Sequence, residues 1–322
     1  MARILTGITS NNIPHLGNIL GAMLPAIELS NKAENQSLYF IADLHSLISL
    51  KDAEARKSSI HAIAAAWIAL GLDTEKNILY RQSDIPQVTE LTWYLNCFTP
   101  YPMLANATSF KDKASRLSDV NSGLFTYPVL MAADILMYDA NVVPVGKDQL
   151  QHLEMTRDIA ERFNHQYGNT LVVPEAKIEE NVMIVPGIDG QKMSKSYNNF
   201  INIFLPEKEL KKVVMSIVTD SKGIAEPKDP DTCNVFNLYK LLADASQTEE
   251  LKAKYLAGGV GYGDAKLRLF ILLIDKFAKA RETYNHLMAN PAQIDAELKK
   301  GAIKAAAIAN PILAKVRSKL GY

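Results

Sequence analysis

Residues 3–18 read RILTGITSNNIPHLGN, and the order of residue types in this stretch indicates the class of fold. The run over residues 3–6 is mostly apolar, ends at Gly7 and has the composition of a short buried strand. A polar loop follows, and apolar residues then recur at helical spacing over residues 18–29, where Pro25 is expected to kink the helix. A strand, a polar loop and a helix in this order predict the start of a βαβ unit.

The same alternation continues through the first two-thirds of the chain. Residues 38–42 and 78–80 are predicted strands, and residues 53–70, followed by a glycine, are a predicted helix between them. Another strand is predicted over residues 142–145, directly before a helix over residues 149–167. Strands that alternate with helices pair in parallel, so we predict an α/β fold with a Rossmann-like, doubly wound parallel sheet.

The strand signals end near residue 205, and the pattern beyond it is helical. Helices are predicted over residues 210–218, 235–245, 265–288 and 292–320. We therefore predict two domains. The first comprises residues 1–205 with a less regular insertion near residues 100–140, and the second is a mostly helical domain of residues 206–322.

Composition and charge narrow the classes of protein. The 322 residues are 48% hydrophobic and 22% charged, which excludes bulk disorder, and 35 Lys and Arg balance 35 Asp and Glu. That balance hides an asymmetry, because residues 251–322 contain 13 basic and 5 acidic side chains. A neutral protein with one basic end favours a polyanionic partner that touches that end only.

The cysteine count and the apolar runs bear on the compartment. Cys97 and Cys233 cannot form a disulfide framework, and the sequence has no CxxC pair to bind zinc, so no metal site is predicted. The longest uninterrupted apolar stretch, residues 62–70, is far short of the roughly 20 residues of a membrane span. Because the run after Arg3 stops at Gly7, we also expect no secretory signal. These features predict a cytoplasmic protein without membrane association.

Three polar clusters fall where a parallel sheet places its ligands, beyond the carboxyl ends of strands. The loop over residues 7–18 offers a glycine, side-chain donors and a helix N-terminus, which suit a phosphate. Residues 146–149, Gly-Lys-Asp-Gln, can hold a ribose or a small polar group, and residues 192–196, Lys-Met-Ser-Lys-Ser, can follow a polyphosphate. Taken singly, the first cluster is better explained as a capped loop and the second as an acidic helix start, and the third can equally be a solvated basic loop.

The ordered set of clusters is more specific than any one of them. His-Leu-Gly-Asn at 15–18, Gly-Lys-Asp-Gln at 146–149 and Lys-Met-Ser-Lys-Ser at 192–196 together resemble the class I aminoacyl-tRNA synthetases. Residues 126–136, 143–152 and 156–164 are similar to the bacterial-type tryptophanyl branch of that family. The sequence departs from the family at residues 9–12, Thr-Ser-Asn-Asn instead of Gln-Pro-Ser-Gly, and at Lys147, where the family has an acidic residue.

The resemblance implies an activity and its partners. It implies ATP-dependent attachment of L-tryptophan to tRNA(Trp) through a tryptophanyl-adenylate, with ATP and Mg²⁺ as cofactors, by a protein that forms a homodimer. The first domain would then be catalytic, and the helical domain would bind the tRNA and its anticodon. Attack of a carboxylate on a phosphorus builds charge on phosphate oxygens, which lysines and amide dipoles stabilise.

The resemblance also assigns roles by position. The residues expected to act on the phosphates are His15, Lys111, Lys192 and Lys195. The residues expected to bind ATP are Thr9, Ser10, Asn11, Gly17, Asn18, Gly146, Lys147, Asp148, Met183, Lys192, Met193, Ser194, Lys195 and Ser196. The residues expected to bind tryptophan are Leu5, His45, Tyr127, Met131, Asp134 and Gln149, with Asp134 accepting the indole N–H. The candidate tRNA phosphate contacts are Arg268, Lys279, Arg281, Lys299, Lys300 and Lys304.

Other interpretations stay open at the level of the sequence. A tyrosyl enzyme would share the fold, although Asp134 favours tryptophan. A non-catalytic RNA-binding paralogue would not need Lys192 and Lys195. A small nucleotidyltransferase would share only the His-x-Gly element and would not explain the basic end. Asp134 is alternatively a helix cap, and His45 an ordinary surface histidine.

Overall fold

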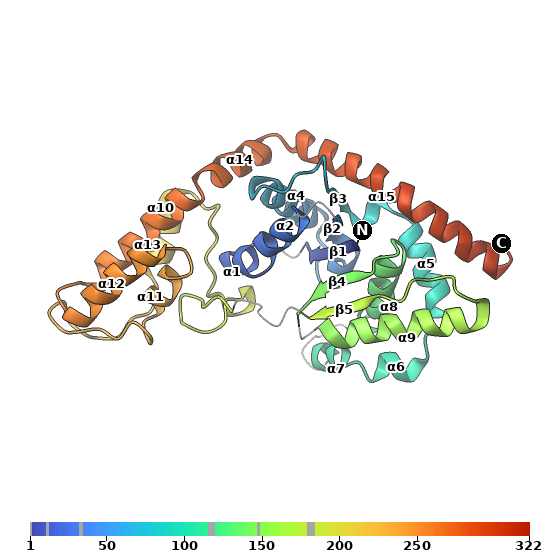
Figure 1. Ribbon diagram of the computed structural model, residues 1–322, viewed down its shortest axis with the longest axis horizontal. Helices are drawn as coiled ribbons and strands as arrows, with labels where there is room; N and C mark the ends of the chain where they lie inside the picture. The colour runs from blue at the N-terminus through green and yellow to red at the C-terminus, as the bar shows by residue number, and fades with distance from the viewer. Residues whose placement is uncertain (1, 11–12, 32–34, 115–119, 147–148, 179–183) are drawn as a thin grey trace.

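A computed structural model describes residues 2–10, 13–31, 35–114, 120–146, 149–178 and 184–322 of the chain (Figure 1). Five parallel strands form one sheet in the order β3-β2-β1-β4-β5. The strands are β1 (Ala2–Thr9), β2 (Asn35–Ala42), β3 (Ile78–Arg81), β4 (Val142–Val145) and β5 (Glu175–Ile178). The predicted parallel α/β sheet is therefore confirmed, and β5 is a strand that the sequence pattern did not reveal.

The strand order reverses between β1 and β4. The chain moves outward from β1 to β2 and β3, and it then returns to place β4 on the other side of β1. At such a reversal an open parallel sheet commonly binds its ligands, beyond the carboxyl ends of the two strands. This point of reversal is where the first two polar clusters of the sequence begin.

Helices cover the sheet and continue beyond it. The helical segments before β4 are α1 (Leu16–Asn18), the π-helix η1 (Ile19–Met23), α2 (Leu24–Ser30), α3 (Asp43–Ser46), α4 (Ala53–Ala69), the 3₁₀-helix η2 (Gln82–Asp84), α5 (Gln87–Asn96), α6 (Tyr101–Ala105), α7 (Thr108–Ala114) and α8 (Ser122–Leu136). Those after β4 are α9 (Leu150–Tyr167), the 3₁₀-helix η4 (Lys195–Tyr197), α10 (Glu207–Met215), α11 (Asn234–Tyr239), α12 (Ala245–Ala257), α13 (Tyr262–Lys276), α14 (Ala278–Ala289) and α15 (Pro291–Leu320).

Several predicted elements differ in detail from the observed ones. The single helix expected over residues 18–29 is divided into α1, η1 and α2, and Pro25, which has no backbone N–H to donate, follows the π-helical segment. The stretch near residues 100–140 contains α6, α7 and α8 rather than irregular chain. The helix expected over residues 265–288 is two helices, because the backbone leaves helical geometry at Phe277.

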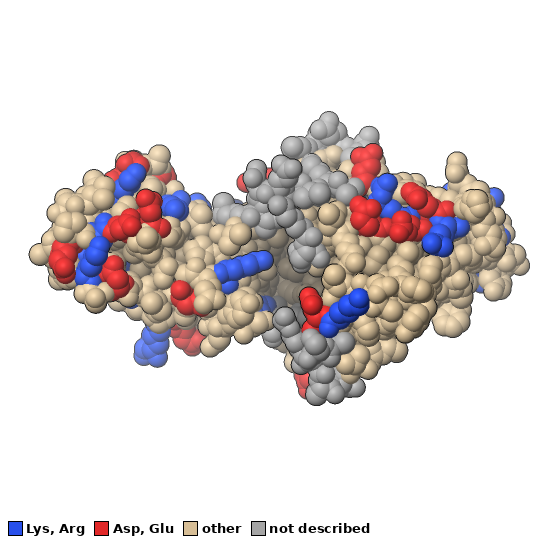
Figure 2. Space-filling model, turned by 90° about the horizontal axis from the view of Figure 1, so that it is seen from below, with Lys and Arg blue, Asp and Glu red and all other residues tan. Residues whose placement is uncertain are grey.

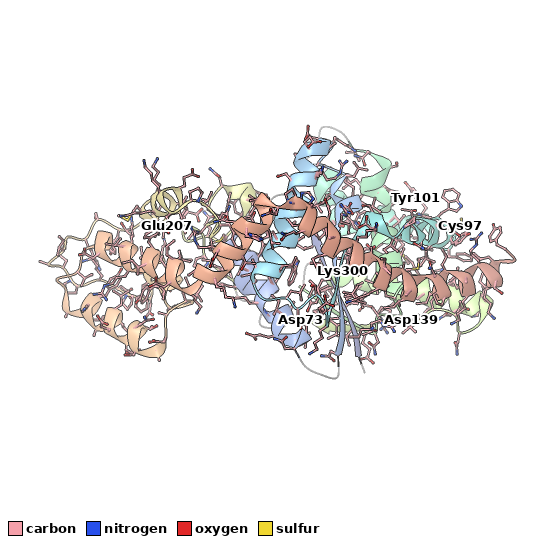
Figure 3. All side chains as sticks on the ribbon, turned by 90° about the horizontal axis from the view of Figure 1, so that it is seen from above. Asp73, Cys97, Tyr101, Asp139, Glu207 and Lys300 are labelled. Carbon is pink, nitrogen blue, oxygen red and sulfur yellow. The ribbon has the colours of Figure 1, made fainter. Side chains whose placement is uncertain are left out.

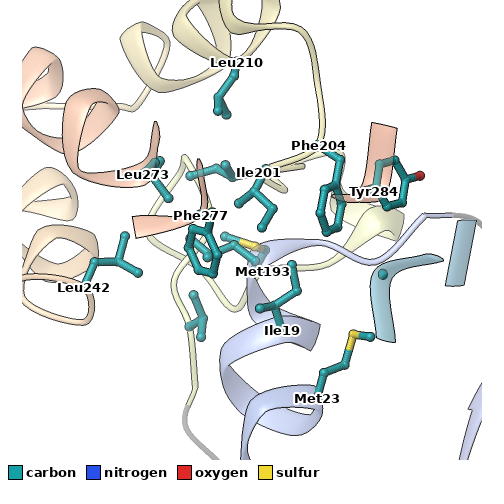
Figure 4. Close-up of a cluster of buried hydrophobic side chains, with 14 of the residues drawn as sticks. Ile19, Met23, Met193, Ile201, Phe204, Leu210, Leu242, Leu273, Phe277 and Tyr284 are labelled. Atoms are coloured by element: carbon teal, nitrogen blue, oxygen red, sulfur yellow. The ribbon is translucent and has the colours of Figure 1, made fainter. Parts of the chain in front are cut away.

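The buried core of the helices after residue 205 is continuous with the core of the first part of the chain. Ile19 and Met23, next to the first polar loop, belong to the same buried cluster as Leu273 and Phe277 from the helical part. Figure 4 shows Met193 and Ile201 of the intervening loop lying among them. Packing of this kind ties the position of the loop to both parts of the molecule.

The long helix α15 lies back on the first part of the chain. In Figure 1 it runs from α14 over the sheet, and it packs against β3, α4 and α5. Gly301 permits the close approach, since a Cβ at that position would stand 1.7 Å from the carbonyl oxygen of Leu79 in β3. Figure 3 shows Lys300 of α15 above the strands. The structure thus differs from the expected division at residue 205, because residues 291–320 cover the edge of the sheet.

Candidate functional site

A cavity of about 230 Å³ lies at the carboxyl end of β1. Its walls come from the loop after β1, from α1, from α4 and from the lysine loop, by which we mean residues 187–199. The lining residues are Ile8, Thr9, Pro14, His15, Asn18, Ile63, Ser194 and Lys195. The structure therefore brings together five residues predicted to bind ATP or its phosphates. Thr9, His15 and Asn18 come from the first cluster, and Ser194 and Lys195 come from the third.

His15 is held in one orientation by the start of α1. Its Nδ1 accepts from the backbone N–H of Asn18 at 3.2 Å, and the Asn18 side chain accepts from the backbone N–H of His15 at 3.2 Å. Burial, and then the charge of Lys195, lower the pKa of His15 to about 4. The ring is therefore neutral at pH 7, and because Nδ1 accepts, the proton is on Nε2, which remains as a donor.

The lysine loop is fastened on both sides of Lys195. Asn199 accepts from the backbone N–H of Ser194 at 2.7 Å and donates to Asp189 at 2.8 Å. Met193 is buried, and its sulfur accepts from the backbone N–H of Gly17 at 3.3 Å. Gly17 has no side chain to obstruct this contact, since a Cβ there would meet Met193 and the His15 ring at 3.4 and 3.0 Å. These contacts dock the loop on α1.

Lys195 is the half-buried cation of this cavity. Burial alone lowers its pKa to about 8. A desolvated ammonium interacts more strongly with an anion than a solvated one does. The cavity thus combines a cation, the Nε2–H of His15 and the start of α1, which is an arrangement suited to phosphate oxygens.

Other residues predicted for the ATP site lie elsewhere. Ser10 is fully buried and donates to Ser46 at 2.8 Å, so its hydroxyl does not line the cavity as predicted. Lys192 and Ser196 are exposed on the lysine loop, and Lys111 on α7 donates to Asn106 at 3.1 Å. Gly146 closes β4 and accepts from the backbone N–H of Gln149. The predicted residues Asn11, Lys147, Asp148 and Met183 lie outside the described residues.

A second group of polar side chains surrounds Asp134, which is 1% exposed in α8. His45 Nε2 lies 3.0 Å from one of its carboxylate oxygens, and the amide of Gln82 donates to both oxygens at 2.9 and 2.7 Å. Burial raises the pKa of Asp134 above its ordinary value, and the contacts with His45 and Gln82 offset only part of that rise. Asp134 is therefore not a helix cap, and His45, whose side chain is 12% exposed, is not an ordinary surface histidine.

The remaining predicted tryptophan-binding residues lie near this carboxylate. The rings of His45 and Tyr127 are in edge contact at 6.1 Å between centroids. The hydroxyls of Tyr127 and Ser109 both lie 2.9 Å from Nε2 of His152, which joins α7, α8 and α9. The other three residues predicted to bind tryptophan are the buried Leu5 in β1, the half-buried Met131 in α8 and the half-buried Gln149 before α9.

Gln82, whose amide donates to both carboxylate oxygens of Asp134, belongs to none of the clusters recognised in the sequence. The usable signal was its position, since it directly follows β3 at the edge of the sheet where the other clusters lie. The bond between Ser10 and Ser46 also connects the cavity to this group, because Ser46 belongs to α3 beside His45. The two groups therefore adjoin at one edge of the sheet.

Figure 2 shows a hollow near the middle of the molecule, with Lys or Arg side chains on both of its sides. Among the described residues, no three His, Cys, Asp or Glu side chains are grouped so as to bind a metal ion. In the same described ranges, none of the helices has the length and apolar character that crossing a membrane requires.

The basic residues of the C-terminal end are not all available for a polyanion. Arg281 is buried and donates to the carbonyl oxygen of Ile203, and Arg268 pairs with Glu250 at 3.1 Å. Lys304 donates to the carbonyl oxygens of residues 74 and 75 at 3.1 and 3.0 Å, and Lys300 donates to residue 297. Arg281 is therefore not available as one of the six candidate phosphate contacts, because its guanidinium is buried within the fold.

Comparison with known proteins gives consistent matches. The model of the family "tRNA synthetases class I (W and Y)" matches residues 1–278. A tryptophan–tRNA ligase of Pseudomonas aeruginosa is 48% identical over an alignment of 330 residues, gaps included. The alignment covers 99% of this chain and 73% of that protein. One from Campylobacter jejuni is 44% identical over 319 residues, 99% of each chain. The crystal structure of tryptophanyl-tRNA synthetase from C. jejuni with ADP and tryptophan has a TM-score of 0.96 and covers 99% of this chain and all of that one.

Proposed function

Because this chain belongs to the class I tRNA synthetases for tryptophan and tyrosine, we propose that its two adjoining polar groups bind the two reactants of amino-acid activation. The activity is the ATP-dependent attachment of tryptophan to tRNA through a tryptophanyl-adenylate. The cavity beside β1 receives the triphosphate, and the group around Asp134 receives the amino acid. The observation that carries this division is the placement of Lys195 and Asp134 at the same edge of the sheet.

At the nucleotide end, the described residues offer donors to the phosphate oxygens. The carboxylate of tryptophan attacks the α-phosphorus, and the bond to pyrophosphate breaks, so negative charge moves onto the leaving group. Lys195 compensates that charge, and His15 donates from Nε2. We assign Lys192 and Lys111 to the same phosphates, because both are exposed, one on the lysine loop and one on α7.

We propose that Mg²⁺ enters with ATP and is required. A triphosphate carries more negative charge than Lys195, Lys192 and Lys111 together can offset, and His15 is neutral. Magnesium keeps several waters and is commonly bound through substrate phosphates together with one or two carboxylates, rather than by an all-protein cage. When bound, it withdraws charge from the phosphate oxygens, while the residues of the cavity orient the α-phosphorus toward the incoming carboxylate.

At the amino-acid end, Asp134 accepts the indole N–H. Its carboxylate is buried, so a ring without a donor would lose a hydrogen bond to a charged group at a cost on the order of 1–3 kcal/mol. Burial raises the pKa of Tyr127, which therefore keeps its proton and can bind the amino-acid backbone together with Gln149. Leu5, Met131 and His45 border the ring.

We also propose the partners and the place of action. The cognate RNA is tRNA(Trp), with exposed Lys279 and Lys299 among its contacts. A homodimer is favoured by the large exposed apolar side chains Trp93 on α5 and Tyr101 on α6, which are 69% and 72% exposed. The place of action is the cytoplasm, where tRNA is charged for protein synthesis, and both described cysteines are free thiols.

An ATP–pyrophosphate exchange assay across the twenty standard amino acids tests the proposal. Exchange is expected with tryptophan and far less with tyrosine and phenylalanine, and it is expected to stop when a chelator removes Mg²⁺. Equal exchange with tyrosine would remove the assignment of Asp134. Full activity in chelator would contradict the role of the metal alone. Sedimentation of the purified protein as a monomer would contradict the homodimer.

A further inference from the structure

Gln82 is completely buried at the carboxyl end of β3, and its amide contacts groups on two other elements. The amide nitrogen donates to both carboxylate oxygens of Asp134 in α8, at 2.9 and 2.7 Å. The amide oxygen accepts from the backbone N–H groups of Leu44 and His45 in α3, at 3.0 and 3.4 Å. One side chain thus joins the end of a strand to two helices that border the amino-acid site.

The chemistry of these partners fixes the orientation of the amide. Backbone N–H groups can only donate and an ionised carboxylate can only accept, so a reversed amide would place two donors together and two acceptors together. The observed orientation is the one that pairs every group. Asp134 in turn receives hydrogen bonds on both oxygens, which restricts rotation of the carboxylate and favours its ionised form in a buried site.

We infer that Gln82 is a positioning residue that holds Asp134 as an ionised acceptor in one orientation, and thereby sets the preference for a substrate ring that carries an N–H. Gln82 acts through the carboxylate and is not assigned a contact with the reacting atoms. This inference rests on the proposed role of Asp134. The interaction with the ring N–H exists both before and during the reaction, so its loss should raise KM for tryptophan and leave kcat nearly unchanged.

Two substitutions separate the parts of the amide. Gln82→Met has a similar length and neither donor nor acceptor. Gln82→Glu keeps an oxygen for the N–H groups of Leu44 and His45 but removes the donors and faces Asp134 with a second carboxylate. The matched control is Asn77→Ala, which removes another buried amide from just before the same strand, where Asn77 donates to the carbonyl oxygen of Asp73 at 3.0 Å.

The measured quantity is the ratio of kcat/KM for tryptophan to that for its benzothiophene analogue, in which sulfur replaces the ring N–H. A merely structural change weakens both substrates alike and leaves this ratio unchanged. We expect the ratio to fall about tenfold in Gln82→Met and further in Gln82→Glu, because a misplaced or protonated carboxylate no longer distinguishes the two rings. KM for ATP and the ratio in Asn77→Ala are expected to stay within about twofold of the unmodified protein.

Asp134→Ala distinguishes failure of the inference from failure of the site. If Asp134→Ala abolishes the preference for the N–H ring while both Gln82 variants retain it, the inference about Gln82 is wrong and the assignment of Asp134 stands. If Asp134→Ala itself keeps the preference, the assignment of the site is wrong. Should neither Gln82 variant fold, Gln82→Asn, which keeps an amide one methylene shorter, is expected to lower the ratio by a smaller factor, and an unchanged ratio there overturns the inference.

Discussion

Replacement of Lys195 by alanine tests the chemistry of the nucleotide cavity most directly. The change removes the half-buried ammonium from a cavity of about 230 Å³ and leaves the backbone contacts of the lysine loop in place. Loss of one preorganised donor that meets developing charge lowers a rate by about 10²–10³, equivalent to roughly 2.7–4 kcal/mol. We expect adenylate formation to slow by this factor, while tryptophan binding changes little.

The lowered pKa of Lys195 also predicts that activity declines as the pH rises. With a pKa of about 8, Lys195 is charged below that pH and loses its charge as the pH rises through it. About nine-tenths of the molecules carry the charge at pH 7 and about one-tenth at pH 9. Because bound ATP stabilises the charged form, the decline belongs to kcat/KM for ATP, which reports the free enzyme. Lys195→Arg keeps its charge throughout this range, so its profile should be flat.

Single-turnover measurement of adenylate formation is the assay. Lys208→Ala serves as the matched control, because Lys208 is an exposed lysine on α10 away from the cavity. An unchanged rate in Lys195→Ala would refute the assignment of this ammonium to the transition state. If Lys195→Arg still lost activity between pH 7 and pH 9, a different group would be responsible for the alkaline decline.

Other expected outcomes follow from close contacts and from burial. Gly301→Ala should lower the free energy of unfolding by more than about 3 kcal/mol, because the new Cβ would stand 1.7 Å from a carbonyl oxygen. A denaturant titration measures this change, and a loss below about 0.5 kcal/mol would be inconsistent with the packing of α15 on β3. Gly17→Ala should weaken ATP binding about tenfold by calorimetry and spare tryptophan binding, because its Cβ would press on the His15 ring; equal loss for both ligands would point to general damage. The pKa of His15 is lowered from 6.5 to about 4, so the unfolded chain binds this proton more readily than the folded one. The free energy of unfolding should therefore fall as the pH drops from 6.5 to 4. His15→Gln should remove this part of the decline in pH-dependent unfolding curves, and a curve identical to that of the unmodified protein would contradict the shift.

Local patterns were sufficient to predict the sheet. The apolar runs of β1, β2, β3 and β4 are short and end at glycine or polar residues, so their period and length could be recognised without tertiary information. The strand β5 was missed, because residues 175–178, Glu-Ala-Lys-Ile, do not form an apolar run. Its pairing with β4 supplies what its composition does not.

The site was predictable where a motif carried it. Lys195 and His15 belong to recognisable clusters, and contacts such as that of Met193 with Gly17 bring the two clusters together in the fold. Gln82 belongs to no motif, and its partner Asp134 is 52 residues away in sequence, so only the folded chain reveals the pair. Ser10 has the composition of a ligand-binding loop residue, yet its hydroxyl bonds to Ser46 within the protein.

Charge composition alone did not identify which basic residues at the C-terminal end are available to a polyanion. The excess of basic residues there is real, but composition does not show which cations the fold itself employs. Lys304 fastens α15 to the loop before β3, and Arg281 donates to a backbone carbonyl inside the protein. A long cationic side chain often serves packing as well as charge, and only its contacts distinguish the two uses.

The position of α15 has a consequence for how the polypeptide is made. The strand β3 is at the edge of the sheet, and the helix that covers it is synthesised much later, since Lys304 and its partner Thr74 are 230 residues apart. During translation, the edge of the sheet at β3 is therefore exposed until α15 has been synthesised. An uncovered edge strand can pair with another nascent chain. Chaperone binding to ribosome-bound chains that stop before residue 291 should exceed binding to chains that include α15, because this helix covers the edge of a sheet whose strands are synthesised much earlier.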